Sequence, residues 1–175
     1  MAYATIADAS ANFQATTYTG NGGTQTITNA GNSNLKPDWL WVKNRSATDS
    51  HMLSDSTRGS TYAINSNGTG AQFVPTNGNV AFLTDGFSVG SNNNYNRNSS
   101  SLIAWQWKAN GGTTSSNSSG SITSTVQANT AAGFSIVKWT GTGSNGTVGH
   151  GLGKAPSFIL FKNYGAAENW TTYHE

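Results

Sequence analysis

One stretch of the chain occurs twice, and it restricts the fold more than any other feature. Residues 36–44 read KPDWLWVKN, and residues 154–163 read KAPSFILFKN. In both, a proline precedes a run of large apolar residues and Lys-Asn follows it. Proline at the start of a strand removes no ladder hydrogen bond, and aromatic and β-branched residues fit a pleated, half-buried surface. The runs are too short for a core helix, so each predicts a β-strand.

The similarity extends on both sides of the repeated stretch. Upstream, residues 13–22 (FQATTYTGNG) match residues 134–143 (FSIVKWTGTG) at an offset of 134 − 13 = 121. From the prolines onward the offset is 156 − 37 = 119, because the loop at 31–36 has two more residues than its counterpart. A length change confined to a Gly/Asn loop is typical of two diverged copies of one unit. The chain is therefore predicted to be a repeat protein.

The second copy is predicted to be incomplete. It reaches Glu175 at the point where the first copy is only at Ser56, so its counterparts of the later strands are absent from the sequence. Either the chain belongs to a longer protein or the missing strands come from a neighbour, and the first is the plainer interpretation. We expect a first repeat over residues 1–112, a Gly/Ser/Thr/Asn linker at 113–120 and an incomplete repeat at 121–175.

Composition favours an all-β protein. Charged residues are 9% of the chain, compared with roughly 25% in ordinary soluble domains. The chain contains six tryptophans, six tyrosines and seven phenylalanines, and this aromatic content argues against disorder. Eight to ten short strands with regular turn signals predict an antiparallel β-sandwich of the jelly-roll or lectin-like kind. Asp85-Gly86 predicts a hairpin within residues 80–89. Residues 102–108 alternate, and we expect their tryptophan side, which carries Ile103, Trp105 and Trp107, to face inward.

Several function classes are disfavoured. The net charge of +2 comes from thinly spread residues without a Lys/Arg cluster, so nucleic-acid binding is not expected. The chain has no Cys, which excludes disulfides and thiolate metal sites. The first residues lack a basic and an apolar region, so no secretory signal is expected, and no window is apolar enough for a membrane span.

Catalytic chemistry has little support in the sequence. A glycan-degrading enzyme would need two of the seven carboxylates at catalytic separation, and several of these lie in turn contexts that favour Asp for local backbone bonding. The histidines His51, His150 and His174 lack metal-ligand spacing. The prediction is a non-enzymatic protein without metal or cofactor.

Several residues of the sequence are candidates for ligand binding. On a polar surface of low charge, exposed aromatics could stack on sugar rings while Asn, Asp and Arg bind hydroxyls. The candidates are Tyr95 and Arg97 on an Asn-rich loop, and His51, Asp55 and Arg58 near the first repeated strand. The alternative is that Tyr95 anchors its loop and that Asp55 and Arg58 form a structural turn pair. Single exposed aromatic residues are common on protein surfaces without any binding role, so this alternative is favoured. For the tryptophans at 39, 41, 105 and 107 we expect core or subunit contacts rather than a ligand platform.

The order of motifs resembles a repeat of structural proteins of marine tailed bacteriophages. The similarity rests on residues 13–22, on PDWLWVKNR at 37–45, DGF at 85–87 with GS at 90–91, and AWQWKANGG at 104–112. The segments GSITSTV at 120–126 and VGHGLG at 148–153 resemble the next copy. The loop at 29–36 departs from the family's shorter approach to the proline, so its surface role is open.

The resemblance implies a concanavalin-like fold on a tail fibre or another virion protein of uncharacterised function. It implies localisation in the virion, other virion proteins as partners and a homo-oligomer, a trimer if the protein is a fibre. The function expected is host attachment through a surface glycan or receptor. An architectural role as capsid decoration or tail adaptor is the alternative, and a glycan depolymerase is less favoured.

Overall fold

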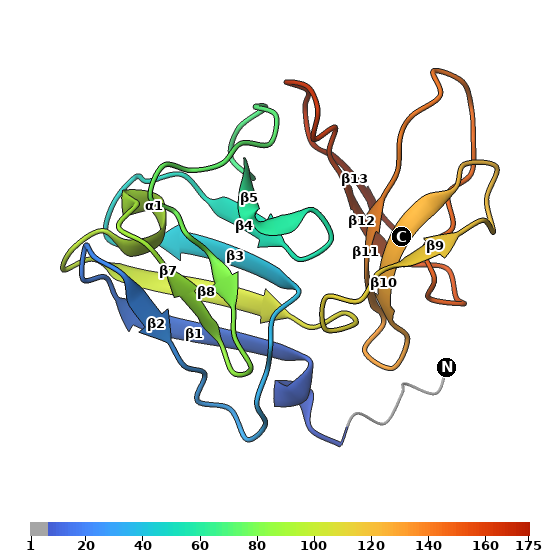
Figure 1. The fold of residues 1–175 in the computed structure, drawn as a ribbon. Coiled ribbons are helices and arrows are strands. Elements are labelled where there is room, and N and C mark those ends of the chain that lie inside the picture. The colour runs from blue at the N-terminus through green and yellow to red at the C-terminus, as the bar shows by residue number, and fades with distance from the viewer. Residues whose placement is uncertain (1–6) are drawn as a thin grey trace.

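The computed structural model describes residues 7–175 as an all-β protein with antiparallel sheets (Figure 1). The first eight strands are β1 (Phe13–Thr19), β2 (Gln25–Ile27), β3 (Trp39–Asn44), β4 (Met52–Asp55), β5 (Gly59–Asn65), β6 (Ala81–Phe82), β7 (Phe87–Val89) and β8 (Ser101–Trp107). The later strands are β9 (Ser115–Asn117), β10 (Ser124–Asn129), β11 (Phe134–Lys138), β12 (Phe158–Phe161) and β13 (Thr171–His174). Two single-turn helices, η1 (Ala9–Ala11) and α1 (Asn93–Asn96), complete the elements. No helix of the described part is long and apolar enough to cross a membrane.

Strands β1 to β8 form a two-layered, sandwich-like unit. A five-stranded sheet in the order β1-β8-β3-β4-β5 packs against a three-stranded sheet in the order β2-β7-β6 (Figure 1). The core between them contains Ile27, Leu40, Val42, Met52, Ala63, Val80, Phe87, Val89, Tyr95, Leu102 and Ala104. Apart from Val80 and Tyr95, which lie outside the strands, these residues come from alternate strand positions, because successive side chains of a strand point to opposite faces.

The hairpin predicted within residues 80–89 is confirmed. Phe82 of β6 pairs with Phe87 of β7, and Gly86 between them has a φ of 95°. A Cβ on Gly86 would lie 2.1 Å from the carbonyl oxygen of Ile27. Only glycine fits this turn, because it tolerates both the positive φ and the close approach of a neighbouring backbone.

The expectation that the tryptophans of residues 102–108 face the sandwich core is wrong. Leu102, Ala104 and Gln106 are fully buried between the sheets, whereas the side that carries Trp105 and Trp107 is half-buried on the opposite face of the five-stranded sheet. The alternation correctly separated the two sides. It did not identify the core side, because the second unit also packs on part of the opposite face at Trp107.

The remaining strands form a second unit of two small sheets, β11-β10-β9 and β12-β13. The segment 113–120, expected to be an irregular linker, contains β9, which pairs with β10 through polar residues. Pairing gives backbone groups of this Ser-rich segment hydrogen-bond partners, which composition does not reveal.

The pairings of the two repeated stretches coincide. Trp39 pairs with Asp55, and Phe158 pairs with His174, so both residues are displaced by 119 (158 − 39 and 174 − 55). The loop bonds coincide as well. The Lys43 Nζ donates to the carbonyls of Ala47 and Asp49, and the Lys162 Nζ donates to those of Ala166 and Glu168, again at an offset of 119.

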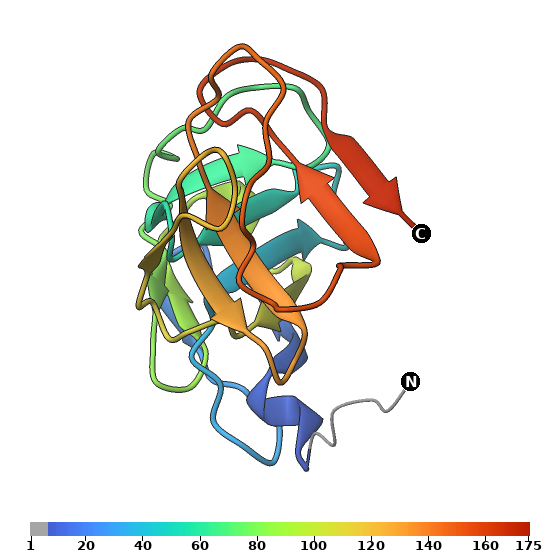
Figure 2. The same ribbon diagram turned by 90° about the vertical axis from the view of Figure 1, so that its right-hand side faces the viewer.

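The second unit packs on the tryptophan side of the five-stranded sheet (Figure 2). Trp107 stacks on Phe134, with ring centroids 6.2 Å apart. The fully buried Gln127 donates to the hydroxyls of Ser56 and Thr57, both at 2.9 Å. Trp170 donates from Nε1 to the carbonyl of Asn65 at 3.1 Å. Apolar contacts and hydrogen bonds therefore join the two units.

Candidate functional site

Tyr95 lies in the core rather than on the surface. The residue belongs to α1, is fully buried, and shares a 3.0 Å hydrogen bond between its hydroxyl and that of Ser54. Its carbonyl accepts a 2.6 Å hydrogen bond from the Tyr18 hydroxyl. Burial raises the pKa of Tyr95 to about 12. The expectation that Tyr95 is exposed is wrong: the side chain lies in the core and anchors the α1 loop there.

Asp55 and Arg58 form the turn pair that was the alternative to a binding role. Their side chains are 2% and 8% exposed, and the Arg58 Nε donates to an Asp55 carboxylate oxygen. The Arg58 backbone N–H donates to the other carboxylate oxygen at 2.8 Å. The expectation that both are exposed is therefore wrong. A carboxylate engaged by its own turn closes the connection between β4 and β5 and has little surface to offer a ligand.

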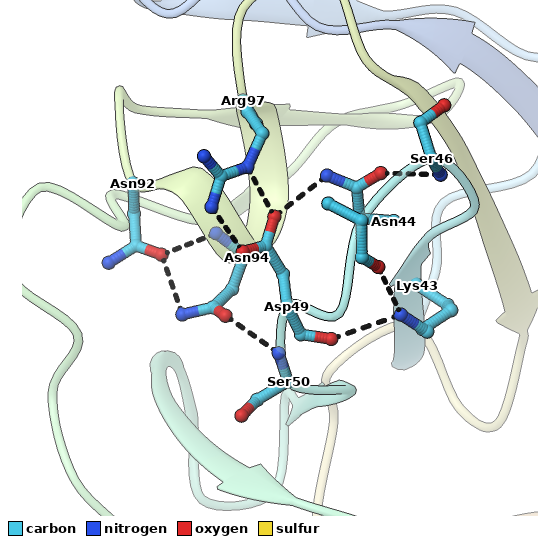
Figure 3. Close-up of polar contacts among 9 residues, drawn as sticks. Lys43, Asn44, Ser46, Asp49, Ser50, Asn92, Asn94 and Arg97 are labelled. Atoms are coloured by element: carbon cyan, nitrogen blue, oxygen red, sulfur yellow. Dashed lines mark hydrogen bonds and ion pairs between the residues drawn. The ribbon is translucent and has the colours of Figure 1, made fainter.

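Arg97 uses its guanidinium to hold Asp49 (Figure 3). Its Nε donates a hydrogen bond to Asp49 Oδ2 at 2.7 Å, and its Nη2 donates one to Asp49 Oδ1, so the ion pair is bidentate. Asn44 Nδ2 also donates to Oδ2 at 2.7 Å, while Lys43 Nζ donates to the Asp49 carbonyl at 3.1 Å. The Arg97 side chain remains 41% exposed.

Amides extend this network to the next loop. Asn94 Oδ1 accepts from the Ser50 backbone N–H at 2.9 Å, and Asn92 Oδ1 accepts from the Asn94 backbone and side chain (Figure 3). The loop between β3 and β4 is thereby tied to the α1 loop. Both loops are fixed with few charges, which gives a physical role to the Asn-rich sequence.

The network is expected to make stability depend on acid pH. The Arg97 hydrogen bond holds the pKa of Asp49 below its ordinary value, so its contribution to stability is complete above the unfolded-state pKa of about 3.9. That contribution disappears as pH falls through the lower folded-state pKa. In urea unfolding from pH 7 to pH 2.5, we expect Asp49→Asn to be less stable than the wild type at pH 7 and the difference to shrink below about pH 4. A difference constant over this range would contradict the assignment.

His51 is the predicted residue that reaches an aromatic surface. Its ring centroid lies 6.4 Å from that of Trp41, and Trp41 meets Trp105 at 5.6 Å in an edge-on arrangement. All three side chains are half-buried. The pKa of His51 is lowered mainly by desolvation and to a smaller extent by the positive charge of Lys43, so the ring is neutral at pH 7. We call Trp41, Trp105 and His51 the tryptophan–histidine surface.

The sequence analysis proposed His51 as a binding residue but did not include the two tryptophans of this surface among the binding candidates. Trp41 and Trp105 pair across β3 and β8, where Trp39 also pairs with Trp107. Trp107 contacts the second unit, as expected for a core or subunit contact, whereas Trp41 and Trp105 lie farther along the same strands. The signal was the shared parity of the four tryptophans, which places them in one stripe on one face.

Most aspartate side chains in the described part of the chain accept hydrogen bonds from backbone N–H groups. Asp38 accepts from the backbone N–H groups of Ala109 and Gly111, both at 2.8 Å, and Asp85 accepts from that of Leu35 at 3.2 Å. Among residues 7–175, no group of three His, Asp or Glu side chains could hold a metal ion. His150 accepts a backbone hydrogen bond from Leu152 within its glycine-rich turn.

A second surface feature is an open hollow of about 500 Å³ in the second unit. Its lining includes Asn117, Ser119, His150 and Lys154. The lining mixes these polar side chains with Val148, Ala155 and glycines, and one ring nitrogen of His150 already accepts a hydrogen bond within its own turn. Its lining contains no tryptophan, whereas the tryptophan–histidine surface has two.

Comparison with known proteins supplies a family. No curated protein and no solved structure matches the chain. A family model described as a domain of unknown function (DUF7483) matches residues 8–175 and so spans both units. The chain belongs to this DUF7483 family.

Proposed function

We propose that the protein is a non-enzymatic structural module of a bacteriophage virion, on a tail fibre or the particle surface, that serves host attachment by binding a surface glycan or receptor. Its fold would be a jelly-roll or lectin-like sandwich with a complete first repeat and half of a second. Its partners would be other virion proteins and further copies of itself in a symmetric oligomer, a trimer in a fibre. The observation that carries the proposal is the tryptophan–histidine surface.

This surface has the chemistry that a neutral sugar requires. Indole rings offer large, rigid apolar faces, and a few polar groups beside them can fix orientation. His51 is kept neutral by its surroundings, so it can both donate and accept a hydrogen bond. The nearby network of Asp49 and Arg97 fixes the loop that leads into His51. A preformed site avoids the entropy cost of ordering a loop on binding.

An architectural role is the second candidate, and a different observation favours it. The second unit exposes Phe158 by 55%, Leu160 by 39% and Tyr173 by 49%. Exposed apolar side chains on neighbouring strands are typical of surfaces that contact another protein. A depolymerase receives less support, because Asp38, Asp49 and Asp55 are engaged in holding turns and loops.

Glycan binding tests the proposal. We expect the wild-type protein to bind at least one glycan of an array of host-surface saccharides and Trp105→Ala to weaken that binding tenfold or more, since truncating a central tryptophan typically costs over 1.4 kcal/mol. His51→Ala, a milder change, should weaken it as well. Phe73→Ala is the matched control, because Phe73 is an exposed aromatic outside this surface.

Calorimetric titration would give the affinities, and thermal unfolding would show that each variant is folded. Absence of binding by the wild type, or equal binding by Trp105→Ala and the wild type, would contradict attachment through this surface. The architectural role would then be the better account.

A further inference from the structure

A row of side chains along β3 leads from the tryptophan–histidine surface to two cations. Alternate residues of a strand point to the same face, so Trp41, Lys43 and Arg45 all lie on the tryptophan side of the five-stranded sheet. Arg45 follows the last residue of β3 but continues its ladder, because its N–H donates to the Ser101 carbonyl at 2.7 Å. A rise of about 3.3 Å per residue places Arg45 about 13 Å from Trp41 along the strand.

Strands β8 and β1 widen this row into a face with an aromatic end and a cationic end. At the aromatic end, Trp41 pairs with Trp105. At the cationic end, the residues of β8 and β1 in register with Lys43 and Arg45 are Ile103, Ser101, Thr17 and Thr19. Thr17 and Thr19 are exposed, and their hydroxyls can both donate to and accept from the hydroxyls of a sugar.

The cationic end has hydrogen-bond donors that the protein does not use. Lys43 Nζ donates to the carbonyls of Ala47 and Asp49, which leaves one of the three N–H groups of its ammonium (Figure 3). The exposed guanidinium of Arg45 has five N–H groups, and among residues 7–175 it makes one hydrogen bond, to the Ser101 hydroxyl at 3.4 Å. Unused cationic donors favour a ligand that carries acceptors with negative charge.

No carboxylate in the described part of the chain forms an ion pair with either of these cations. Arg58 pairs with Asp55 at the opposite end of β4, and Arg97 pairs with Asp49. Asp49 also accepts from Asn44 Nδ2, so both of its carboxylate oxygens are already bonded by the protein. Two positive charges therefore remain at the cationic end without a bonded counter-ion.

We propose that this face binds an acidic glycan, with one sugar ring on Trp41 and Trp105 and a carboxylate or sulfate group of the same chain bound by Arg45 and Lys43. The planar guanidinium matches the geometry of two acid oxygens, and the ammonium adds a point charge beside it. The proposal rests on the attachment function proposed above and adds the class of ligand. The tryptophans accommodate a neutral ring, and the cations select chains that also carry acid groups.

Single-stranded nucleic acid is also anionic and also stacks on aromatic rings, but the face fits it less well. Such a strand has a phosphate at every nucleotide and binds in grooves whose cations follow its backbone. Here both cations lie at one end of the face and both tryptophans at the other. This arrangement matches a chain in which only some residues are charged.

Pairs of oligosaccharides that differ only in charge test the class of ligand. Each pair consists of an acidic chain and its neutral derivative, either a uronic-acid chain with its carboxyl-reduced form or a sulfated chain with its desulfated form. In calorimetric titration, we expect the wild type to bind at least one acidic chain tenfold or more tightly than its neutral derivative. The kind of pair that shows this preference distinguishes a carboxylate from a sulfate. Raising the salt concentration from about 0.05 M to about 0.5 M should reduce the preference, because salt screens exposed charges.

Arg45→Gln tests the cationic end directly. Because Arg45 is exposed, the variant should fold as the wild type does, bind the acidic chain about tenfold more weakly and bind the neutral derivative equally well. Lys36→Gln is the matched control, since it removes an exposed cation beyond the other end of β3 and should change neither affinity.

Three results would overturn the proposal: equal binding of acidic and neutral chains, affinity for the acidic chain unchanged by Arg45→Gln, or tighter binding of an oligothymidylate than of any acidic glycan. If the wild type binds neutral chains only, and Trp105→Ala weakens that binding, the attachment function stands and the acidic preference is wrong. Absence of binding to every chain would contradict both.

Discussion

Replacing Tyr95 with alanine is expected to lower the free energy of unfolding by about 3–5 kcal/mol, because it removes a fully buried aromatic ring from the core. The ring lies beneath the α1 loop, and its hydroxyl bonds that of Ser54. Tyr95→Phe keeps the ring and leaves the Ser54 hydroxyl without this partner, so a loss of about 1 kcal/mol is expected. Urea unfolding followed by tryptophan fluorescence measures both changes.

Tyr62→Ala is the matched control for Tyr95, since Tyr62 is 38% exposed and its replacement should change stability by about 0.5 kcal/mol or less. A stable Tyr95→Ala variant that had lost only ligand binding would restore the original expectation of an exposed binding residue. That result would contradict the core position.

Replacing Asp38 with alanine is expected to cost about 3 kcal/mol. Its fully buried carboxylate accepts from two backbone N–H groups, of Ala109 and Gly111, and from the Ser56 hydroxyl at 2.7 Å. These partners lie just after β8 and in the turn after β4, so one side chain joins three segments. Removing it leaves buried donors without acceptors, and each such donor costs about 1–3 kcal/mol.

Asp85→Asn serves as the control for Asp38, because the Asp85 carboxylate is half-buried and accepts a single, longer bond from the Leu35 N–H. Its replacement should cost under about 1 kcal/mol. Equal losses for Asp38→Ala and Asp85→Asn in urea unfolding would show that the Asp38 contacts contribute no more than one ordinary surface bond.

Much of the fold could be predicted from local sequence. A proline followed by a run of large apolar residues located β3 and β12, and Asp-Gly located the hairpin of β6 and β7. These signals are local, because they reflect backbone geometry within a few residues. The constant offset between Trp39 and Phe158 also anticipated equal pairing in the two hairpins.

The candidate site was harder to predict because burial depends on distant partners. Tyr95 sits in an Asn-rich loop that looks exposed, yet Tyr18 and Ser54, far away in sequence, enclose it. The shared parity of Trp105 and Trp107 was evident, but it did not show that the second unit packs on Trp107 at one end of that face. Sequence alternation defines faces, whereas tertiary contacts decide what lies over each face.

The location of the chain in an intact particle tests the attachment account most directly. Cryo-electron microscopy of the virion that carries it should show the protein on a fibre or on the outer surface, with Trp41, Trp105 and His51 facing solvent. A position at a tail joint or within the capsid lattice, with this surface buried between subunits, would contradict attachment and leave an architectural protein. Absence of the chain from the particle would contradict the virion assignment itself.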